Sequence, residues 1–522
     1  MIREISRRKC LRLWLCKPEY MERTKWENRF VLLRFWKKNY MMFLKDLKRF
    51  KMERLYDKLK AYSESDFYAF HMPGHKRNKA LLGIELPYDL DITEIDGFDD
   101  LHHADGILKE EQERAARVFG AEESHFLVNG STAGILSAVM GCTHRGDKIL
   151  VARHCHKSIY HAIYMNGLVP RYVYPEFDIS MHMNGEISKE DVAKALAAEP
   201  DIKAVVIVSP NYDGVVSDVK GIAEVAHSYR IPLIVDEAHG PHFGFHPAFP
   251  GRANDLGADV VINSLHKTLP SLTQTAILHI NGKIVNRRRI KKYLDMLQSS
   301  SPSYIFMASL DACVDFVDGK CENEFELYVE RLQKFREELK PLQHLQILRT
   351  EHYDISKVVI STANANITSP ELAERLRKEY HLEMEMTGGT YVLAMTTVAD
   401  TQEGLDRLKA ALLEIDGQLE AKTAVSGSIE ISGELPRLEQ YFTPQEAADW
   451  EEDGEAEEIP WKESEGHISL EYAYLYPPGS PVIVPGERIS REAVELLCYY
   501  ETQNLQIEGI QTEGKIKVWK HE

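Results

Sequence analysis

Short apolar runs alternate with helical stretches between about residues 124 and 280, and this alternation constrains the fold more than any other feature of the sequence. The stretch Lys189–Ala198 is typical of a helix, because Ser188 can cap its start and Asp191 follows three residues on. Strands that alternate with helices form mainly parallel sheets covered on both faces, and such sheets bind ligands beyond the carboxyl ends of their strands. The sequence therefore predicts an α/β fold with strands at Phe126–Val128, Lys148–Val151, Arg171–Tyr174, Ala204–Val208, Leu233–Val235, Val260–Ile262 and Ala276–His279.

The chain has 522 residues, enough for more than one domain. We expect an N-terminal arm with a large domain over 52–300, a smaller α/β domain over 301–420, and a linker with a C-terminal domain over 421–522. The smaller domain is predicted from helical and strand-like stretches at Glu324–Leu339, Pro370–Tyr380 and Tyr391–Met395. An acidic run over 446–459 predicts a solvated linker or the edge of a helix.

Residues 1–51 differ from the rest of the chain in charge. Residues 1–60 hold nineteen Lys and Arg against seven Asp and Glu, with three tryptophans among them. One interpretation is a basic amphipathic segment for an anionic surface. The interpretation we favour is a translated upstream region outside the working protein, with Met52 as an alternative start.

Composition narrows the function classes. The formal net charge of −18 argues against nucleic acid as a partner, and it suits either a cationic substrate or simple solubility. Seven cysteines without paired spacing indicate a reducing cytoplasm and no disulfide framework. No stretch approaches the ~18 uninterrupted apolar residues of a membrane span, so a membrane protein is not expected.

A lysine and an aspartate each follow a predicted buried strand, 31 positions apart. Asp236 follows Leu233–Val235, and Lys267 comes shortly after Val260–Ile262. Pyridoxal phosphate chemistry requires such a pair, an amine for a Schiff base and a carboxylate at the pyridine nitrogen. Alone, Asp236 fits the cap of a following turn equally well, but together with Lys267 it favours a cofactor site. Ala238, two residues on, would offer a small surface beneath the ring.

Other small and polar residues complete the predicted cofactor site. The loop Asn129–Gly134 follows a strand and opens a helix, where free amides and the hydroxyls of Ser131 and Thr132 can bind a phosphate. Taken alone, this loop is equally well a capped strand-to-helix turn. Ser264 and His266 could add phosphate donors beside Lys267.

His156 could stack on a flat cofactor ring, since it follows another predicted strand. The competing interpretation is a metal site built from nearby side chains, namely His154, Cys155, His156 and His161. Adjacent ligands project in different directions and no second Cys/His pair lies at zinc spacing, so we expect no metal. His102, His103 and His242 are expected to be ordinary loop histidines.

Taken in order, these motifs resemble the fold-type I pyridoxal-phosphate enzymes, and within them the ornithine/lysine/arginine decarboxylase family in its short form without an N-terminal receiver-like domain. The resemblance extends from Phe70 to about Glu487. It is carried by the segments Phe70–Lys76, Asp91–Glu94, Asp99–His102, Phe126–Thr132, His154–Ser158, Ser264–Lys267, Tyr476–Gly479 and Pro485–Glu487.

The resemblance implies a fold-type I transferase-like large domain, a smaller α/β domain and a C-terminal domain. It also implies decarboxylation of arginine, lysine or ornithine to CO2 and a diamine or polyamine precursor. Catalytic roles would fall to Lys267, His156 and Asp236. The cofactor, pyridoxal 5′-phosphate, would be held by Ser131, Thr132, His156, Asp236, Ala238, Ser264, His266 and Lys267. The family's active sites lie between subunits, so at least a homodimer is implied, with Gln298–Tyr304 reaching the neighbour's site.

Two alternatives stay open at this point. One is another fold-type I reaction, by an aminotransferase or an α-oxoamine synthase, with which Asp236–Gly240 is compatible. The other is a catalytically silent regulatory protein on the same scaffold. Ser480, His467 and Thr387–Gly389 depart from the family pattern, and they leave the choice of substrate open.

Overall fold

The computed structural model describes residues 54–81, 83–178, 183–348, 352–421, 435–475, 479–502 and 507–521. The fold below is that of the unit Leu55–Glu522. The basic extension over 1–51 lies outside the described residues.

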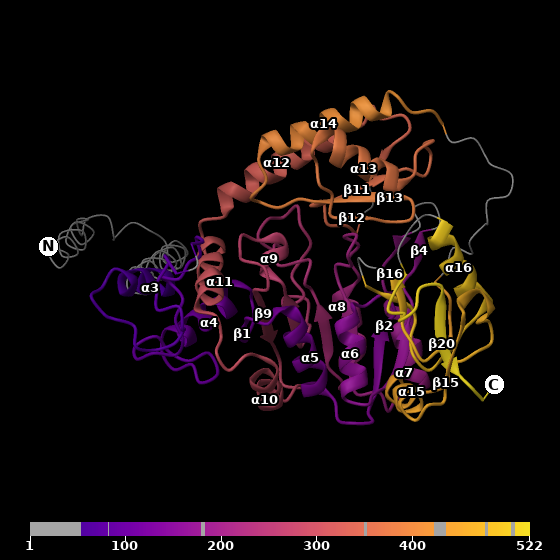
Figure 1. Ribbon diagram of the computed structural model, residues 1–522, viewed down its shortest axis with the longest axis horizontal. Coiled ribbons are helices and arrows are strands. Elements are labelled where there is room, and N and C mark those ends of the chain that lie inside the picture. The colour runs from indigo at the N-terminus through magenta and orange to yellow at the C-terminus, as the bar shows by residue number, and fades with distance from the viewer. Residues whose placement is uncertain are drawn as a thin grey trace, which may run out of the picture. The chain divides into compact units, whose positions relative to one another are not determined.

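A seven-stranded sheet in the order β1-β9-β8-β7-β6-β2-β3 forms the centre of this unit (Figure 1). Only β9 runs antiparallel to its neighbours in this sheet, and the remaining pairs are parallel. The predicted α/β class is therefore confirmed, and each expected strand lies within three residues of its observed bounds. The strands are β1 (Glu123–Leu127), β2 (Lys148–Ala152), β3 (Val169–Val173), β6 (Val205–Val208), β7 (Leu233–Asp236), β8 (Val260–Asn263) and β9 (Ala276–Ile280).

Two hydrophobic cores lie against the sheet, and side chains of β1 divide between them, because consecutive side chains of a strand point to opposite faces. Leu127 of β1 packs into one core, whereas its neighbour Phe126 packs into the other. The first core includes residues of α5 (Gly130–Cys142), α6 (Lys157–Met165), α7 (Lys189–Ala198), α8 (Val219–Ser228) and α10 (Arg287–Leu297). The second includes residues of α3 (Leu55–Ser63), α4 (Ile107–Val118), α11 (Tyr304–Val317) and α12 (Glu322–Glu338). The predicted cap of α7 is present, since Ser188 accepts from the Asp191 amide.

A separate antiparallel sheet follows α12, in the order β10-β11-β13-β12 (Figure 1). Its strands and helices bury a core of their own. The elements are β10 (Gln346–Ile347), β11 (Lys357–Ser361), α13 (Ser369–Tyr380), β12 (Met386–Thr387), β13 (Tyr391–Met395) and α14 (Gln402–Asp416).

The C-terminal residues form short strands around another core. The acidic run over 446–459 was expected to be a solvated linker or the edge of a helix. Its first part belongs to a helix, and its last part forms a strand that pairs with residues 515–519. A capping box of Thr443 and Glu446 starts that helix, with Pro444 in its first turn. The elements are β14 (Glu439–Gln440), α15 (Pro444–Glu452), β15 (Ala456–Pro460), η2 (Trp461–Glu463), β16 (Ala473–Leu475), β17 (Pro481–Ile483), β18 (Glu487–Arg488), α16 (Arg491–Thr502), β19 (Ile507–Glu508) and β20 (Lys515–Trp519).

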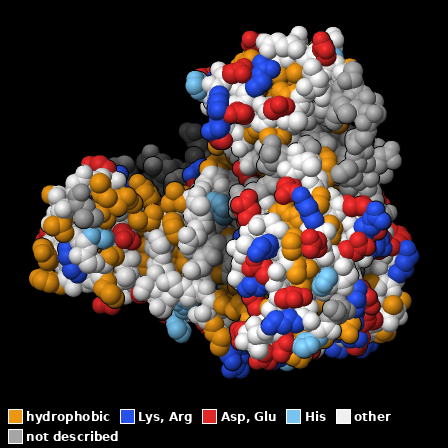
Figure 2. Space-filling model, turned by 45° about the vertical axis from the view of Figure 1, so that its right-hand side comes forward, with side chains coloured by type: hydrophobic (Ala, Val, Ile, Leu, Met, Phe, Trp, Pro, Cys, Tyr) orange, Lys and Arg blue, Asp and Glu red, His pale blue; other side chains and the backbone are white. Residues whose placement is uncertain are grey.

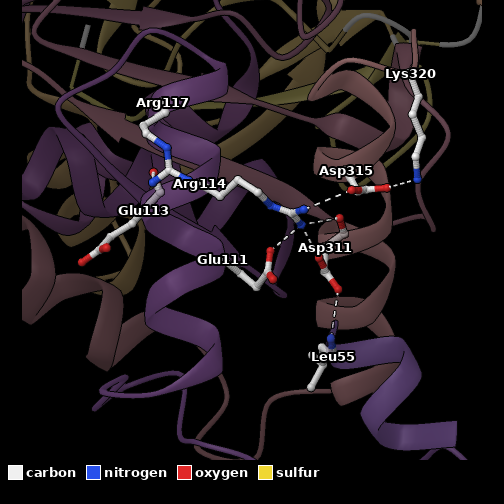
Figure 3. A network of polar contacts seen from close by, with 8 residues as sticks. All are labelled: Leu55, Glu111, Glu113, Arg114, Arg117, Asp311, Asp315 and Lys320. Atoms are coloured by element: carbon white, nitrogen blue, oxygen red, sulfur yellow. Dashed lines mark hydrogen bonds and ion pairs between the residues drawn. The ribbon is translucent and has the colours of Figure 1, made fainter. Parts of the chain in front are cut away.

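A buried ionic network joins α3, α4 and α11 (Figure 3). The Arg114 guanidinium bonds Glu111 and Asp311, and also Asp315 at 3.2 Å. Asp311 in turn accepts the backbone amide of Leu55 at 3.0 Å. Burial, together with the charge of Asp311, raises the pKa of Glu111 to about 9. The network therefore holds the first described helix against the body of the fold.

Among the described residues, no helix combines the length and apolar character needed to cross a membrane.

Candidate active site

Lys267 and Asp236 meet at the carboxyl edge of the central sheet. Asp236 is the last residue of β7, which pairs in parallel with β8. After β8 the chain turns into the short helix α9 (Leu265–Thr268), which carries Lys267. Asp236 is buried and Lys267 is mostly buried, and the charge of each affects the pKa of the other. The pair predicted from the sequence is thus brought together by two neighbouring parallel strands.

The Asp236 carboxyl group lies in a dry site, with a residue exposure of 3%. Burial raises its pKa, and the charge of Lys267 opposes this shift. Oδ1 accepts the backbone amide of Ala238 at 3.1 Å, so the small residue two positions on also lies beside the carboxyl group. A buried carboxylate of this kind is stabilised by a cationic partner.

The Lys267 amine contacts an imidazole. Its Nζ lies 2.8 Å from Nε2 of His239. Burial lowers the pKa of Lys267, and the carboxylates of Asp236 and Glu385 oppose that effect. A lysine held in this way has more of the neutral, nucleophilic amine than an exposed lysine has.

A second buried lysine lies on the other side of the same imidazole. Nζ of Lys357, at the start of β11, is 3.0 Å from Nδ1 of His239. Sequence reasoning missed this residue, because it treated Lys267 as the one strand-end lysine within reach of Asp236. Lys357 comes 90 positions later, in a different sheet, and no local motif marks it.

His156 caps helix α6 and faces the same site. Its Nδ1 accepts the Ser158 amide at 3.2 Å and contacts the Ser158 hydroxyl at 2.8 Å. Burial, and then the charges of Lys267 and Lys157, lower the pKa of His156 to about 4. The imidazole is therefore neutral at physiological pH.

The predicted phosphate-binding residues come from two helix starts. Ser131 and Thr132 lie in the first turn of α5, whose cap position Asn129 makes no side-chain cap bond. Ser264, the cap residue of α9, is fully buried, and among the described residues its hydroxyl has no hydrogen-bond partner. His266 is oriented by the Thr275 carbonyl, 2.8 Å from its Nδ1. Two helix starts without side-chain caps and a buried, unpartnered hydroxyl provide groups that suit an anion.

His242 is not the ordinary loop histidine that was expected. It is buried, with Nδ1 3.0 Å from the Thr268 hydroxyl and Nε2 3.1 Å from Asp354. It therefore links the helix that carries Lys267 to the loop before β11. The one available signal was its position two residues beyond the stretch Asp236–Gly240. In the part of the chain that the structure describes, no group of three or more His, Cys, Asp or Glu is placed to hold a metal ion.

Comparison with known proteins identifies the family. Residues 53–422 match the family described as Orn/Lys/Arg decarboxylase, major domain, and residues 433–514 match its C-terminal domain. The chain is 33% identical over 471 residues to the arginine decarboxylase of Bacillus subtilis, which covers 87% of this chain and 95% of that protein. It is 25% identical to the lysine decarboxylase LdcA of Pseudomonas aeruginosa, over 83% of this chain and 73% of that protein.

A solved structure agrees with this in fold. The constitutive lysine decarboxylase of E. coli superposes with a TM-score of 0.76 at 20% identity, over 95% of this chain and 84% of that one. With the family matches, this confirms the expected fold-type I architecture. The chain belongs to the ornithine/lysine/arginine decarboxylase family, and it is an amino-acid decarboxylase, a carboxy-lyase that acts on a basic amino acid.

Proposed function

We propose that the site around Lys267 binds pyridoxal phosphate and removes the α-carboxyl group of arginine as CO2, leaving the corresponding amine. The observation that carries the proposal is the buried pair of Lys267 and Asp236 at the ends of two parallel strands. The decarboxylase activity and the basic substrate class follow from the family. Arginine is the finer choice, supported by relatives at 32–33% identity that are arginine decarboxylases.

The residues of the site fit pyridoxal phosphate. The buried, unpartnered Ser264 hydroxyl and the start of α5 suit its phosphate. Asp236, whose pKa is raised by burial, suits the pyridine nitrogen, because a cation there would stabilise the carboxylate. The neutral imidazole of His156 suits the ring face, with Ala238 on the other side. When bound, the cofactor withdraws the electrons left on the substrate when CO2 departs.

Each side chain then has a defined task. Lys267 would hold the cofactor through its Nζ amine. Ser131, Thr132, Ser264 and His266 hold the phosphate. Asp236 keeps the pyridine nitrogen protonated, and Lys267 or a nearby histidine returns a proton to Cα. Burial of these groups excludes water, which strengthens their electrostatic effects.

Glu385 is our choice for the group that receives the distal cation of the substrate. It is exposed, precedes β12, and its carboxylate acts on the pKa of both Lys267 and Lys357. The Tyr212 hydroxyl donates to it, while the Tyr212 ring lies 4.6 Å from the His239 ring. A carboxylate so oriented can pair with a guanidinium. Glu385→Gln should raise KM for arginine far more than it lowers kcat.

We further propose that the active unit is a homodimer, formed through the segment that follows α3. This segment exposes Phe70 to 90% and Leu81 to 73%, with further large apolar side chains at Phe67, Tyr68, Met72, Ile84 and Leu86. Figure 2 shows hydrophobic side chains gathered at the left of that view. An exposed apolar patch of this kind indicates an interface. The run Ser299–Ser301, exposed next to Asn129, would reach the neighbour's site.

The assembly has a direct test. Phe70→Ser with Leu81→Ser should give an inactive monomer by light scattering, whereas Leu413→Ser, at an exposed apolar residue of α14, should leave the dimer intact. A fully active wild-type monomer at assay concentration contradicts the proposal.

The remaining assignments complete the proposal. The domains are 52–300, 301–420 and 421–522, and residues 1–51 are outside the working enzyme. The setting is a reducing cytoplasm, supported by the free thiols of Cys142, Cys155, Cys313, Cys321 and Cys498. The product would be a polyamine precursor.

Product identification tests the activity. The full chain, loaded with pyridoxal phosphate, is incubated in parallel with arginine, lysine and ornithine, and CO2 and amines are measured. We expect agmatine, the decarboxylated arginine, as the main product. Release of a keto acid without CO2 would indicate an aminotransferase, and absence of both CO2 and cofactor absorbance would indicate a silent scaffold.

A further inference from the structure

The two buried lysines that flank His239 form one hydrogen-bonded chain, in the order Lys267, His239, Lys357. The two contacts measure 2.8 Å and 3.0 Å, and they engage opposite ring nitrogens. Lys357 has no exposed surface and His239 is 5% exposed. Water is therefore not the partner of the Lys357 amine or of the His239 ring nitrogens.

The chemistry of imidazole limits the charge of this chain. A neutral imidazole has one N–H donor and one acceptor nitrogen, while an ammonium group only donates. If both lysines were charged, both ring nitrogens would have to accept, which a neutral imidazole cannot do. Burial and the charges of Lys267 and Lys357 hold the pKa of His239 well below its ordinary value, so its ring is neutral. The chain therefore accommodates one ammonium group, on one lysine or the other.

The place of Lys357 is built by its surroundings. Its backbone carbonyl accepts from the Tyr353 hydroxyl at 2.7 Å and from Arg336 at 2.8 Å. Gly214, at φ +106°, passes so close that a Cβ there would lie 2.7 Å from Lys357 Cγ. Only glycine suits this backbone conformation and this approach. The amine of Lys357, at the start of β11, thus reaches the imidazole of His239, which follows β7 of the central sheet.

We propose that His239 and Lys357 are a proton relay for Lys267, in which Lys357 takes up the proton that Lys267 must lose before its amine can react. Lys267 Nζ gives a proton to Nε2 of His239, and Nδ1–H of His239 passes a proton to Lys357 Nζ. The imidazole ends neutral in its other tautomer, so one proton moves and no other bond changes. This inference rests on the proposed function, because it assigns Lys267 a reacting amine.

The charges around Lys357 suit a proton acceptor. It faces Asp354 before its own strand, Asp213 in the loop after β6, His239 after β7, Lys267 on α9, and Glu385 before β12. Burial lowers the pKa of Lys357 to about 8; Asp354 opposes this shift and Lys267 adds to it. A lysine with a pKa of about 8 exchanges its proton close to neutral pH, so in its neutral form Lys357 can take up the proton that Lys267 gives up. Lys357 is a positioning residue, since it acts through His239.

The test measures the Lys267 amine directly, without turnover. The full-chain enzyme, freed of cofactor, is acetylated in trace amounts between pH 6 and 10, and acetylation of Lys267 is read by peptide mass spectrometry. The exposed Lys340 in the same digest is the internal reference. In Lys357→Met or Lys357→Gln the proton has no second lysine to occupy, so the pH midpoint of Lys267 acetylation should rise by about one pH unit. At pH 7 such a rise means a tenfold loss of the reactive, neutral amine. In Lys357→Arg the guanidinium must donate to His239, so the midpoint should fall.

A structural role alone would not move the midpoint in opposite directions. The relay passes through His239, so Lys357→Met should matter less once His239 is replaced. In a protein that already carries His239→Leu, adding Lys357→Met should shift the acetylation midpoint of Lys267 by less than half of the shift it causes in the wild type. An unchanged midpoint in a folded Lys357→Met or Lys357→Gln variant overturns the relay, and so does a shift of the same sign for Met and Arg. If Lys357→Arg does not fold, the outcome is decided by Lys357→Met, by Lys357→Gln and by the comparison in the His239→Leu protein. The product assay of the wild type tests the proposed function separately.

Discussion

Glu487→Gln tests how the C-terminal residues hold the site. Glu487 in β18 forms a two-pronged ion pair with Arg153, which follows β2, at 2.7 and 2.8 Å. Arg153 also donates to the Val482 carbonyl at 2.9 Å, and Glu487 accepts the Val484 amide at 2.8 Å. Both side chains are almost fully buried. The pair joins the C-terminal strands to the loop that carries His156, three residues after Arg153.

The magnitude follows from burial. Removing one partner of a buried ion pair leaves the other charge without compensation and costs about 3–5 kcal/mol. Glu487→Gln should therefore lower the free energy of unfolding by that amount. Arg153→Met in the same chain removes the stranded charge, so the double variant should recover part of the loss. The exposed pair Arg491–Glu495 is the matched control, since Glu495→Gln should cost under about 1 kcal/mol.

The assay uses the position of the tryptophans. After residue 52 the chain contains only Trp450, Trp461 and Trp519, all in the C-terminal part. In a protein that begins at Met52, tryptophan fluorescence during urea unfolding therefore reports this part, while circular dichroism reports the helices of the whole. Glu487→Gln should lower the fluorescence midpoint first, and it should weaken cofactor binding by displacing His156. An effect equal to that of Glu495→Gln, or a double variant less stable than Glu487→Gln, would refute the reasoning.

Four further outcomes are expected. Lys267→Ala should abolish turnover and the cofactor's absorbance in its covalently bound form; borohydride trapping of the cofactor on another lysine would contradict this. Asp236→Asn should retain some cofactor through the phosphate site but should lower kcat at least about a hundredfold. A charge-assisted hydrogen bond in a dry site is worth several kcal/mol, and each 1.36 kcal/mol lost from the transition state lowers the rate tenfold. For Glu111, a folded-state pKa of about 9 above an ordinary value of 4.5 means that its contribution to stability is present below about pH 4.5 and is lost as the pH rises to about 9. Glu111→Gln should flatten the dependence of the unfolding free energy on pH in that window, by up to about 1.4 kcal/mol per pH unit, as urea unfolding at a series of pH values will show. Deleting residues 1–51 should leave turnover and assembly unchanged, as measured by steady-state assay and light scattering. Loss of turnover or assembly would show that the extension has a role, and so would vesicle co-sedimentation that the full chain shows and the shortened protein lacks.

The sequence by itself determined the sheet and the pair at its edge. Apolar runs such as Val260–Ile262 must be buried, and alternation with helices makes such strands parallel. Residues that follow parallel strands meet at one edge, so Asp236 and Lys267 could be paired from their spacing alone. The capping box that starts α15 is equally local, yet the acidic run there predicts a solvated linker or the edge of a helix and gives no sign of the strand β15. Acidic residues look solvated in sequence, whether or not their backbone pairs with a strand such as β20.

Tertiary structure decided the contacts between distant segments. His239 and Lys357 lie 118 positions apart, and Arg153 and Glu487 lie 334 apart. Neither contact follows from a periodic pattern in the sequence. The relative placement of separate sheets depends on how their cores pack, and the sequence of either segment is compatible with many placements. His242 shows the same limit, since only the packing of the loop before β11 against α9 gives it Asp354 as a partner. Burial then fixes the chemistry, because a lysine, a histidine or a carboxyl group has a shifted pKa only where folding removes it from water.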